Sequence, residues 1–360
     1  MADDSSVAPP SLDPPADTGG DTDPATGCVV EINSLLDDTD LWEAVLDVLA
    51  EKIDPVQSVK QMAYKDLCVT EALRCVVVPS EACPQALVVF KGGTSLVKAH
   101  KLLNRFSEDI YVNIIPPQEG TFGSGRRKRV RRELQARLNA GIPLPMEHRR
   151  FGDRFASTTI TYPPLADNIM PIVGGPTYGD VLVEMTIRDQ PTDTTTFATV
   201  TSLVGEAAAA IDPALLEEYP ILEPFEVLAA DPIVAVVDKL DALHWRSLSD
   251  KPEDTGLRAR DIHDLACLLR HEPTRAALSS DRVAEMHETV VSSLPPGLAG
   301  RTNVRPTGGF AASPAFQPGE AAYEALKANY PAIRQYVYTD DHWVGFEDAL
   351  AIIHNSSNLI

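Results

Sequence analysis

The chain has 360 residues, of which 44% are hydrophobic, and its formal net charge is −21. This length allows one large domain or two ordinary ones, and the hydrophobic share is normal for a globular core. No run of 18 apolar residues and no basic segment followed by an apolar one occurs, which excludes a membrane-spanning helix and a secretory signal. Five cysteines without metal-ligand spacing suit a reduced, cytoplasmic protein.

The negative charge is concentrated at the start of the chain. The first 50 residues contain no Lys or Arg and twelve Asp or Glu, so the rest carries about −9. One block of opposite sign interrupts this background, the sequence RRKRVRR. It forms either a solvated, salt-bridged helix face or a local site for a nucleic-acid backbone. The RNA-binding candidates are Arg126, Arg127, Lys128, Arg129, Arg131 and Arg132.

The first half of the chain alternates helices and strands. Residues 1–27 are rich in Asp, Pro, Ser, Thr and Gly, which predicts a disordered acidic tail. Helices are predicted at 38–53, 55–76, 94–106 and about 126–139, and strands at 85–91, 108–115, 158–163 and 180–189.

After about residue 205 the pattern becomes helical, with apolar stripes at 232–248 and 257–270. Further helices are predicted near 280–293, 319–337 and 346–353, with a long loop at 293–318. The expected fold is α+β, with a small mixed sheet in residues 28–205 and a helical C-terminal region in residues 206–360.

A glycine turn follows the first predicted strand in the sequence FKGGTSLVKAHKLLNRFSEDI. Gly92 and Gly93 end the strand, and Thr94 and Ser95 start the next helix. Such a turn leaves backbone N–H groups unpaired, and glycine lets an anion approach them. A phosphate is the expected ligand, although two glycines before a helix more often form a simple turn.

Acidic residues on neighbouring strands could hold a divalent metal. Alternate residues of a strand share a face, so Asp109, Tyr111 and Asn113 point the same way. An Asp-x-Asp pattern would place two carboxylates together, but here Tyr111 takes the second position. Glu184, within the apolar run VLVEMTI, is a second candidate ligand, or it faces solvent on an edge strand.

Two later helices carry charges at matching positions. Lys239 shares a helix face with Arg246, and Asp261 and Asp264 lie three residues apart on the next helix. Lys239 could neutralise triphosphate charge, and Asp261 could orient it or act as a base. Spacing alone favours the alternative, ion pairs between two surface helices.

Together these segments resemble the nucleotidyltransferase toxins of the AbiEii/AbiGii family, which includes the MenT toxins. The glycine turn through SEDI resembles the first family motif, VLVEMTI the second, DKLDALHWR the third and RDIHDL the fourth. The resemblance covers roughly residues 40–270, and the first and fourth motifs are the specific ones.

The resemblance implies a polymerase-β-like nucleotidyltransferase fold and Mg²⁺-dependent transfer of a nucleotide from an NTP to an acceptor. The implied acceptor is the tRNA 3′ end, which blocks translation, and the implied partner is an antitoxin of the winged-helix regulator type. The site it implies comprises phosphate contacts from Gly92, Gly93, Thr94 and Ser95, metal ligation by Asp109 with Glu184, triphosphate contact by Lys239, and Asp261 as the fourth-motif acid.

The chain departs from the family at Tyr111, where Asp is common. The loss of one carboxylate leaves two alternatives to the RNA-directed enzyme open. One is a catalytically degenerate relative that still binds a nucleotide, and the other is a nucleotidyltransferase that acts on protein hydroxyls.

Overall fold

The computed structural model describes residues 28–54, 59–77, 86–115, 123–151, 154–163, 165, 180–188, 195–249, 251–292 and 304–360. The tail predicted at 1–27 and the first part of the loop predicted at 293–318 lie outside these ranges. Within the described ranges, no helix is long and apolar enough to cross a membrane.

Seven described strands form one mixed sheet in the order β3-β4-β5-β2-β1-β7-β6. The strand bounds are β1 Leu87–Lys91, β2 Ile110–Ile115, β3 Met146–Phe151, β4 Phe155–Thr161, β5 Asp180–Ile187, β6 Thr195–Val200 and β7 Phe225–Ala230. The pairs β2–β5 and β1–β7 are parallel and the others are antiparallel. In β5, buried side chains alternate with half-buried ones, which places Glu184 on the less buried face.

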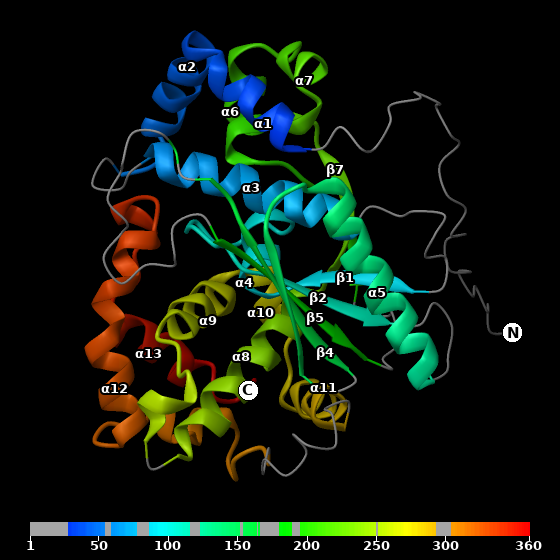
Figure 1. Cartoon of the computed structure of the whole chain (residues 1–360). Helices are drawn as coiled ribbons and strands as arrows, with labels where there is room; N and C mark the ends of the chain where they lie inside the picture. Colours follow the sequence, from blue (N-terminus) through cyan, green and yellow to red (C-terminus); the bar gives the residue numbers. More distant parts are fainter. Residues whose placement is uncertain are drawn as a thin grey trace, which may run out of the picture.

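The sheet lies between two groups of helices (Figure 1). On one side, helix α3 crosses the strands, and its residues share a hydrophobic core with those of the sheet. The helices around this core are α1 Cys28–Asp37, α2 Thr39–Ala50, α3 Val59–Val77, α5 Ser124–Gly141, α6 Leu203–Ile211 and α7 Leu215–Glu218. The Asp38 carboxylate caps α2 by accepting a hydrogen bond from the Leu41 N–H, at 3.1 Å.

The C-terminal helices form a second core. They are α8 Pro232–Ser247, α9 Arg260–Arg270, α10 Glu272–Ala276, α11 Ser280–Ser292, α12 Ala321–Asn329 and α13 Phe346–Asn355, and a 3₁₀-helix at Tyr330–Tyr336 follows α12. The apolar stripes predicted for α8 and α9 are buried as expected. Leu96 and Leu103 from the first half of the chain join this core.

One helix is much shorter than the sequence predicts. The pattern at 94–106 indicated a single helix, but α4 spans only Gly92–Lys98. Lys101, three residues after the end of α4, has a φ of 54°, so the chain does not return to a helical path there. The predicted stripe is therefore split, because Leu96 and Leu103 pack into the helical core while Phe106 packs into the sheet core.

Three strands were missed, and one of them changes the expected organisation. β3, β6 and β7 had no counterpart in the prediction, and β7 lies within residues 206–360, which were expected to be helical. β7 pairs with β1 in the sheet interior. The expected division at residues 205 and 206 therefore runs through a continuous sheet.

A short extended segment also ties the C-terminal half to the first half. The Phe106 N–H donates to the Tyr336 carbonyl at 2.7 Å, and the Tyr338 N–H donates to the Asn104 carbonyl at 3.1 Å. Between them, Arg105 and Val337 form an antiparallel bridge. This pairing holds residues 104–106 and 336–338 side by side.

Candidate active site

The glycine turn lies directly beside strand β2. Gly92 has a φ of +79°, and a Cβ there would lie 3.1 Å from Cδ2 of Tyr111. A Cβ at Gly93 would lie 2.8 Å from Nη2 of Arg105. Gly92 thus meets a conformational requirement, and Gly93 allows a guanidinium to approach the backbone.

The two hydroxyl residues after the glycines are buried, at 1% exposure for Thr94 and 2% for Ser95. The Thr94 hydroxyl donates to the Asp109 carbonyl and shares a 2.9 Å hydrogen bond with the Ser107 hydroxyl. The Ser95 hydroxyl is buried without a hydrogen-bond partner among the described residues. Thr94 therefore positions the loop that carries Asp109, and its hydroxyl is already engaged.

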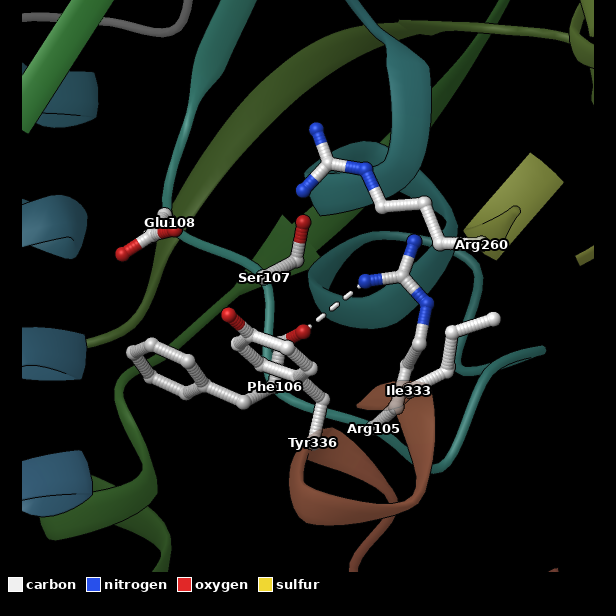
Figure 2. A pocket seen from close by; sticks show the side chains of 7 residues that line it. All are labelled: Arg105, Phe106, Ser107, Glu108, Arg260, Ile333 and Tyr336. Carbon is white, nitrogen blue, oxygen red and sulfur yellow. Dashed lines mark hydrogen bonds between the residues drawn. The ribbon is translucent and has the colours of Figure 1, made fainter. Parts of the chain in front are cut away.

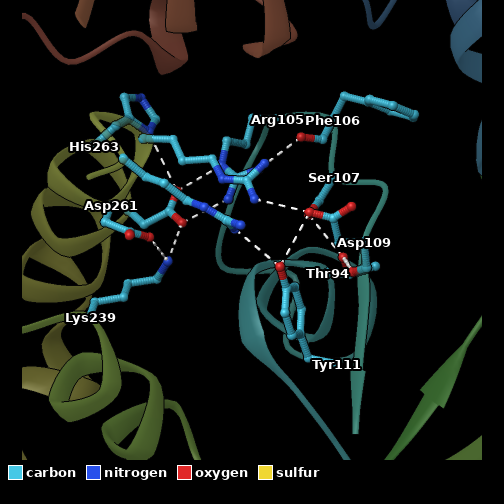
Figure 3. A network of polar contacts seen from close by, with 12 residues as sticks. Thr94, Arg105, Phe106, Ser107, Asp109, Tyr111, Lys239, Asp261 and His263 are labelled. Atoms are coloured by element: carbon cyan, nitrogen blue, oxygen red, sulfur yellow. Dashed lines mark hydrogen bonds and ion pairs between the residues drawn. The ribbon is translucent and has the colours of Figure 1, made fainter. Parts of the chain in front are cut away.

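Asp109 immediately precedes β2 and faces α9. Its Oδ2 accepts hydrogen bonds from Arg260 at 3.1 Å and from the Tyr111 hydroxyl at 3.3 Å (Figure 3). The Asp109 side chain is 19% exposed, so it is partly accessible to a ligand. An acid, a phenol and an arginine therefore meet at the mouth of the turn.

Tyr111 replaces an expected carboxylate and recruits a second arginine. Arg258 Nη1 donates to its hydroxyl at 3.1 Å. Burial and the neighbouring Asp109 charge raise the pKa of Tyr111 to about 12, so the phenol stays protonated. Glu184 lies opposite Tyr111 in the β2–β5 register, and burial raises its pKa despite the nearby Arg258 charge.

A buried ion cluster joins the sheet half to the helical half. Lys239 Nζ lies 2.7 Å from Asp261 Oδ1 and 2.6 Å from Asp264 Oδ2. Arg105 donates to both carboxylate oxygens of Asp264 at 2.7 Å and to the Phe106 carbonyl at 2.8 Å. Arg105, Lys239, Asp261 and Asp264 are called the Asp264 cluster below.

The charges of the Asp264 cluster stabilise one another. Burial opposes ionisation of Asp264, but Arg105 and Lys239 outweigh it and hold its pKa well below the usual range. Lys239 likewise outweighs the burial of Asp261 and lowers that pKa. The sequence-based alternative of ion pairing was thus partly right, because the pairs exist but are buried rather than on the surface.

These contacts bring most of the sequence-predicted residues together. Gly93 touches Arg105, Arg105 binds Asp264, and Asp264 binds Lys239, while Arg260 links α9 to Asp109. Figure 3 shows Asp109 and Tyr111 on one side of this network and Lys239 and Asp261 on the other. Arg105, Arg258, Arg260 and Asp264 were not among the predicted site residues, although the RDIHDL motif contained two of them.

The acidic residues present suit a metal that arrives with its substrate. No group of three or more His, Cys, Asp or Glu among the described residues is placed to hold a metal ion. The candidates are Asp109 and Glu184, the latter adjacent in register to Tyr111. Mg²⁺ is often held by one or two carboxylates, with phosphates and water completing its shell. The pair fits such a site and does not fit a cage made of protein ligands alone.

The basic block lies elsewhere, on helix α5. This helix packs on α3 and is well separated from α8 and α9 (Figure 1). The exposed members of the block are Arg126, Lys128, Arg129 and Arg132, and Arg127 is half-buried. Arg131, also predicted to bind RNA, is only 6% exposed because it lies on the helix face that buries Val130 and Leu134. Its side chain is not part of the accessible surface.

A small pocket adjoins Asp109. Apart from space that is open to solvent, it has room for about one water molecule. Its lining residues are Arg105, Phe106, Ser107, Glu108, Arg260, Ile333 and Tyr336 (Figure 2). Glu108 was not predicted as a site residue, although it stands next to Asp109 in the sequence.

The comparison with known families identifies the class of protein. The sequence matches the family described as "Nucleotidyl transferase AbiEii toxin, Type IV TA system" over residues 73–337. This segment contains all seven described strands, α8 and α9, and the chain belongs to this family. It is therefore a nucleotidyltransferase of a toxin–antitoxin system, for which an NTP substrate and an antitoxin partner are implied.

Other comparisons add little. No curated protein matches the sequence. Among solved structures, the chain is similar to MenT4, a nucleotidyltransferase toxin from Mycobacterium tuberculosis H37Rv, at 16% identity. The match covers 81% of this chain and 94% of that chain, with a TM-score of 0.37. At this score the likeness has no weight of its own, and the assignment rests on the family match.

Proposed function

We propose that the protein is an Mg²⁺-dependent nucleotidyltransferase toxin that moves a nucleotide from an NTP to an RNA acceptor, the tRNA 3′ end, and so blocks translation. The single observation that carries this proposal is the polar network that joins the glycine turn, Asp109 and the Asp264 cluster in one site. Phosphoryl transfer relies on positioning and charge stabilisation, and such a network supplies both.

Each residue has a defined role in this proposal. The backbone at Gly92 and Gly93 contacts the phosphates, with Thr94 and Ser95 shaping the turn beneath it. Lys239 has three N–H donors and uses two of them on Asp261 and Asp264, which leaves one for a phosphate oxygen. Asp261 orients Lys239.

The metal would be held by Asp109 and Glu184, where bound Mg²⁺ supplies neutralisation of phosphate charge. The acceptor hydroxyl attacks the α-phosphorus and loses its proton to solvent, the new P–O bond forms, and the bond to pyrophosphate breaks. Arg258 and Arg260 add positive charge on the same side of the site.

The exposed members of the basic block, Arg126, Lys128, Arg129 and Arg132, would contact the RNA backbone at a distance from the reacting end. The partner would be an antitoxin of the winged-helix regulator type.

One observation favours a catalytically degenerate relative as the second candidate. Arg260 occupies Asp109 Oδ2, and Arg258 occupies the Tyr111 hydroxyl, so guanidinium groups stand where a metal would bind. Such a protein would bind NTP without turnover. A third candidate shares the chemistry and transfers the nucleotide to a protein hydroxyl.

Incubation with tRNA, Mg²⁺ and each labelled NTP tests the proposal. We expect label on RNA with at least one NTP, and no label with Asp109→Ala. Folded protein that transfers no label from any NTP would contradict the proposal. NTP binding without transfer, together with activity gained by Tyr111→Asp, would establish the degenerate candidate. A labelled protein band would establish the third.

A further inference from the structure

Lys91 and Asp238 form an ion pair between the glycine turn and helix α8, and neither residue has a role in the proposed function. Lys91 is the last residue of β1 and directly precedes Gly92. Its Nζ donates to Asp238 Oδ2 at 2.6 Å, and Asp238 directly precedes Lys239 on α8. The ion pair therefore joins the chain neighbours of two groups to which the proposed function gives phosphate contacts.

Lys91 lies on the face of the sheet that carries other site residues. It is opposite Tyr111 in the β1–β2 register, and Tyr111 is opposite Glu184 in the β2–β5 register. Side chains that are opposite one another on neighbouring strands point to the same face. Helix α8 covers this face, because its Val234 packs against the small apolar cluster around Val89, two residues before Lys91. The ion pair therefore forms between the sheet and the helix that lies on the site face.

The ion pair is largely shielded from solvent and both partners are charged. The side chains of Lys91 and Asp238 are 14% and 24% exposed. Burial opposes the ionisation of Asp238, but the charges of Lys91 and Arg188 outweigh it and lower its pKa. A partly buried pair is screened by salt much less than an exposed one, so this contact holds its two elements together more firmly than a surface ion pair does.

Consecutive residues of α8 bind two different parts of the molecule. Asp238 binds the end of β1, whereas Lys239 binds Asp261 and Asp264 on α9. The Cα atoms of consecutive residues are about 3.8 Å apart, and a helix fixes their relative orientation. Helices α4 and α8 are also in direct contact. The ion pair of Lys91 therefore sets where Lys239 lies relative to the glycine turn.

We propose that Lys91 and Asp238 are positioning residues that hold the glycine turn and Lys239 at the separation that one triphosphate requires. The inference rests on the proposed function and adds how two phosphate-binding groups from different parts of the chain are aligned. The turn contacts phosphate through backbone that has no side chain to adjust, and two carboxylates hold Lys239. Neither group can follow a displaced phosphate, so triphosphate affinity depends on their separation.

The test compares wild type, Asp238→Asn and Lys91→Met. NTP affinity is measured by calorimetry, and the KM values for NTP and RNA are measured by label transfer. We expect each variant to bind NTP about 10-fold more weakly, a loss within the range of interaction energies between contacting residues. The KM for NTP should rise and the KM for RNA should not change. A purely structural role would instead reduce the number of folded molecules and leave both KM values unchanged.

The double variant shows whether Lys91 and Asp238 act as a pair. Lys91→Met combined with Asp238→Asn should bind NTP about as well as the weaker single variant, because the second change has no ion pair left to remove. Asp238→Glu keeps the charge and should retain most of the affinity. Glu347→Gln breaks the exposed Lys327–Glu347 ion pair, also 2.7 Å or shorter, and is the matched control that should leave NTP affinity unchanged.

The outcomes separate this inference from the proposed function. If wild type binds no NTP, the proposed function fails and the inference fails with it. If wild type binds NTP but the folded single variants keep its affinity, or the double variant shows the product of the two single losses, the inference alone is overturned. Thermal unfolding identifies the folded variants. Should Lys91→Met not fold, Asp238→Asn, whose side chain is the more exposed one, decides the result.

Discussion

Two groups of buried charges are the Asp264 cluster and the pair of Lys65 and Glu108. They differ in whether their charged atoms have hydrogen-bond partners. In the Asp264 cluster, both carboxylate oxygens of Asp264 are matched by donors from Arg105 and Lys239. In the Lys65–Glu108 pair, Nζ and Oε2 have no hydrogen-bond partner among the described residues. The first arrangement holds two halves of the protein together, and the second leaves two buried charges that do not close into an ion pair. The comparison indicates that a buried charge adds to stability only where its partners match it.

Breaking the Asp264 cluster should have the largest effect. Asp264→Asn removes the negative charge that pairs with the buried Arg105 and Lys239. Loss of one partner of a buried ion pair costs about 3–5 kcal/mol. We expect a drop of this size in the free energy of unfolding, measured by chemical denaturation. The exposed Glu288→Gln should change it by less than about 0.5 kcal/mol. A loss below about 1 kcal/mol for Asp264→Asn would show that the cluster is not structural.

A substitution in the Lys65–Glu108 pair should raise the free energy of unfolding instead of lowering it. The pKa of Glu108 is raised to about 7 in the folded chain, so folding opposes its ionisation. The unfolded chain releases this proton at lower pH, and stability therefore falls as pH rises from about 4.5 to about 7. Glu108→Gln removes this loss, and the upper limit of the gain at pH 8 is about 3 kcal/mol.

The measurement is the unfolding free energy of wild type and Glu108→Gln at pH 4 and pH 8. The difference between the two proteins should be larger at pH 8. Equal differences at pH 4 and pH 8 would mean that the pKa of Glu108 is not shifted. The difference between Glu288→Gln and wild type should not depend on pH.

The contact between the glycine turn and the Asp264 cluster can be tested with one methyl group. Gly93→Ala would place a Cβ 2.8 Å from Arg105 Nη2, and Arg105 cannot move freely because Asp264 holds it. We expect a stability loss of about 1–2 kcal/mol and about 10-fold weaker NTP binding, measured by calorimetry.

Gly125→Ala, where nothing lies within 4 Å of the new Cβ, is the matched control and should be neutral or slightly stabilising. If Gly93→Ala and Gly125→Ala had the same stability and the same NTP affinity, the steric explanation would be contradicted.

The smallest effect is expected from the basic block, which touches neither group of buried charges. Replacing exposed Arg126 and Arg129 by Gln should weaken RNA binding only a few-fold and reduce the salt slope by about 1 to 2. Single-turnover transfer at saturating RNA should be unchanged. The measurement is RNA affinity at several salt concentrations, and an unchanged slope would place the RNA backbone elsewhere.

The sequence predicted the long apolar stripes well, because a stripe depends on local spacing alone. α8 and α9 follow it, and their stripes are buried. The α4 prediction failed because the helix ends at Lys98, Lys101 has a φ of 54°, and residues 104–106 pair with residues 336–338 far along the chain. β7 was missed because its six residues are recognisable only beside β1 and β6.

Site residues that lie within a local sequence motif were predicted. Site residues that only tertiary contacts bring together were missed. Gly92, Gly93 and Asp109 lie within one local pattern. Arg105 meets Asp264, which is 159 positions away, and nothing in local spacing indicates that pair. Glu108 was overlooked because its burial, with Oε2 unpartnered within the described part of the chain, is a property that only the folded chain reveals.

The pairing of residues 104–106 with 336–338 has a practical consequence for chimeras between family members. Tyr336 lines the pocket while its carbonyl accepts from the Phe106 N–H, so one segment contributes both surface and scaffold. A graft of the sheet half alone would contain Glu108 and Asp109 but would lack Tyr336, which lines the same pocket. Exchanged catalytic modules should therefore carry this C-terminal segment with them.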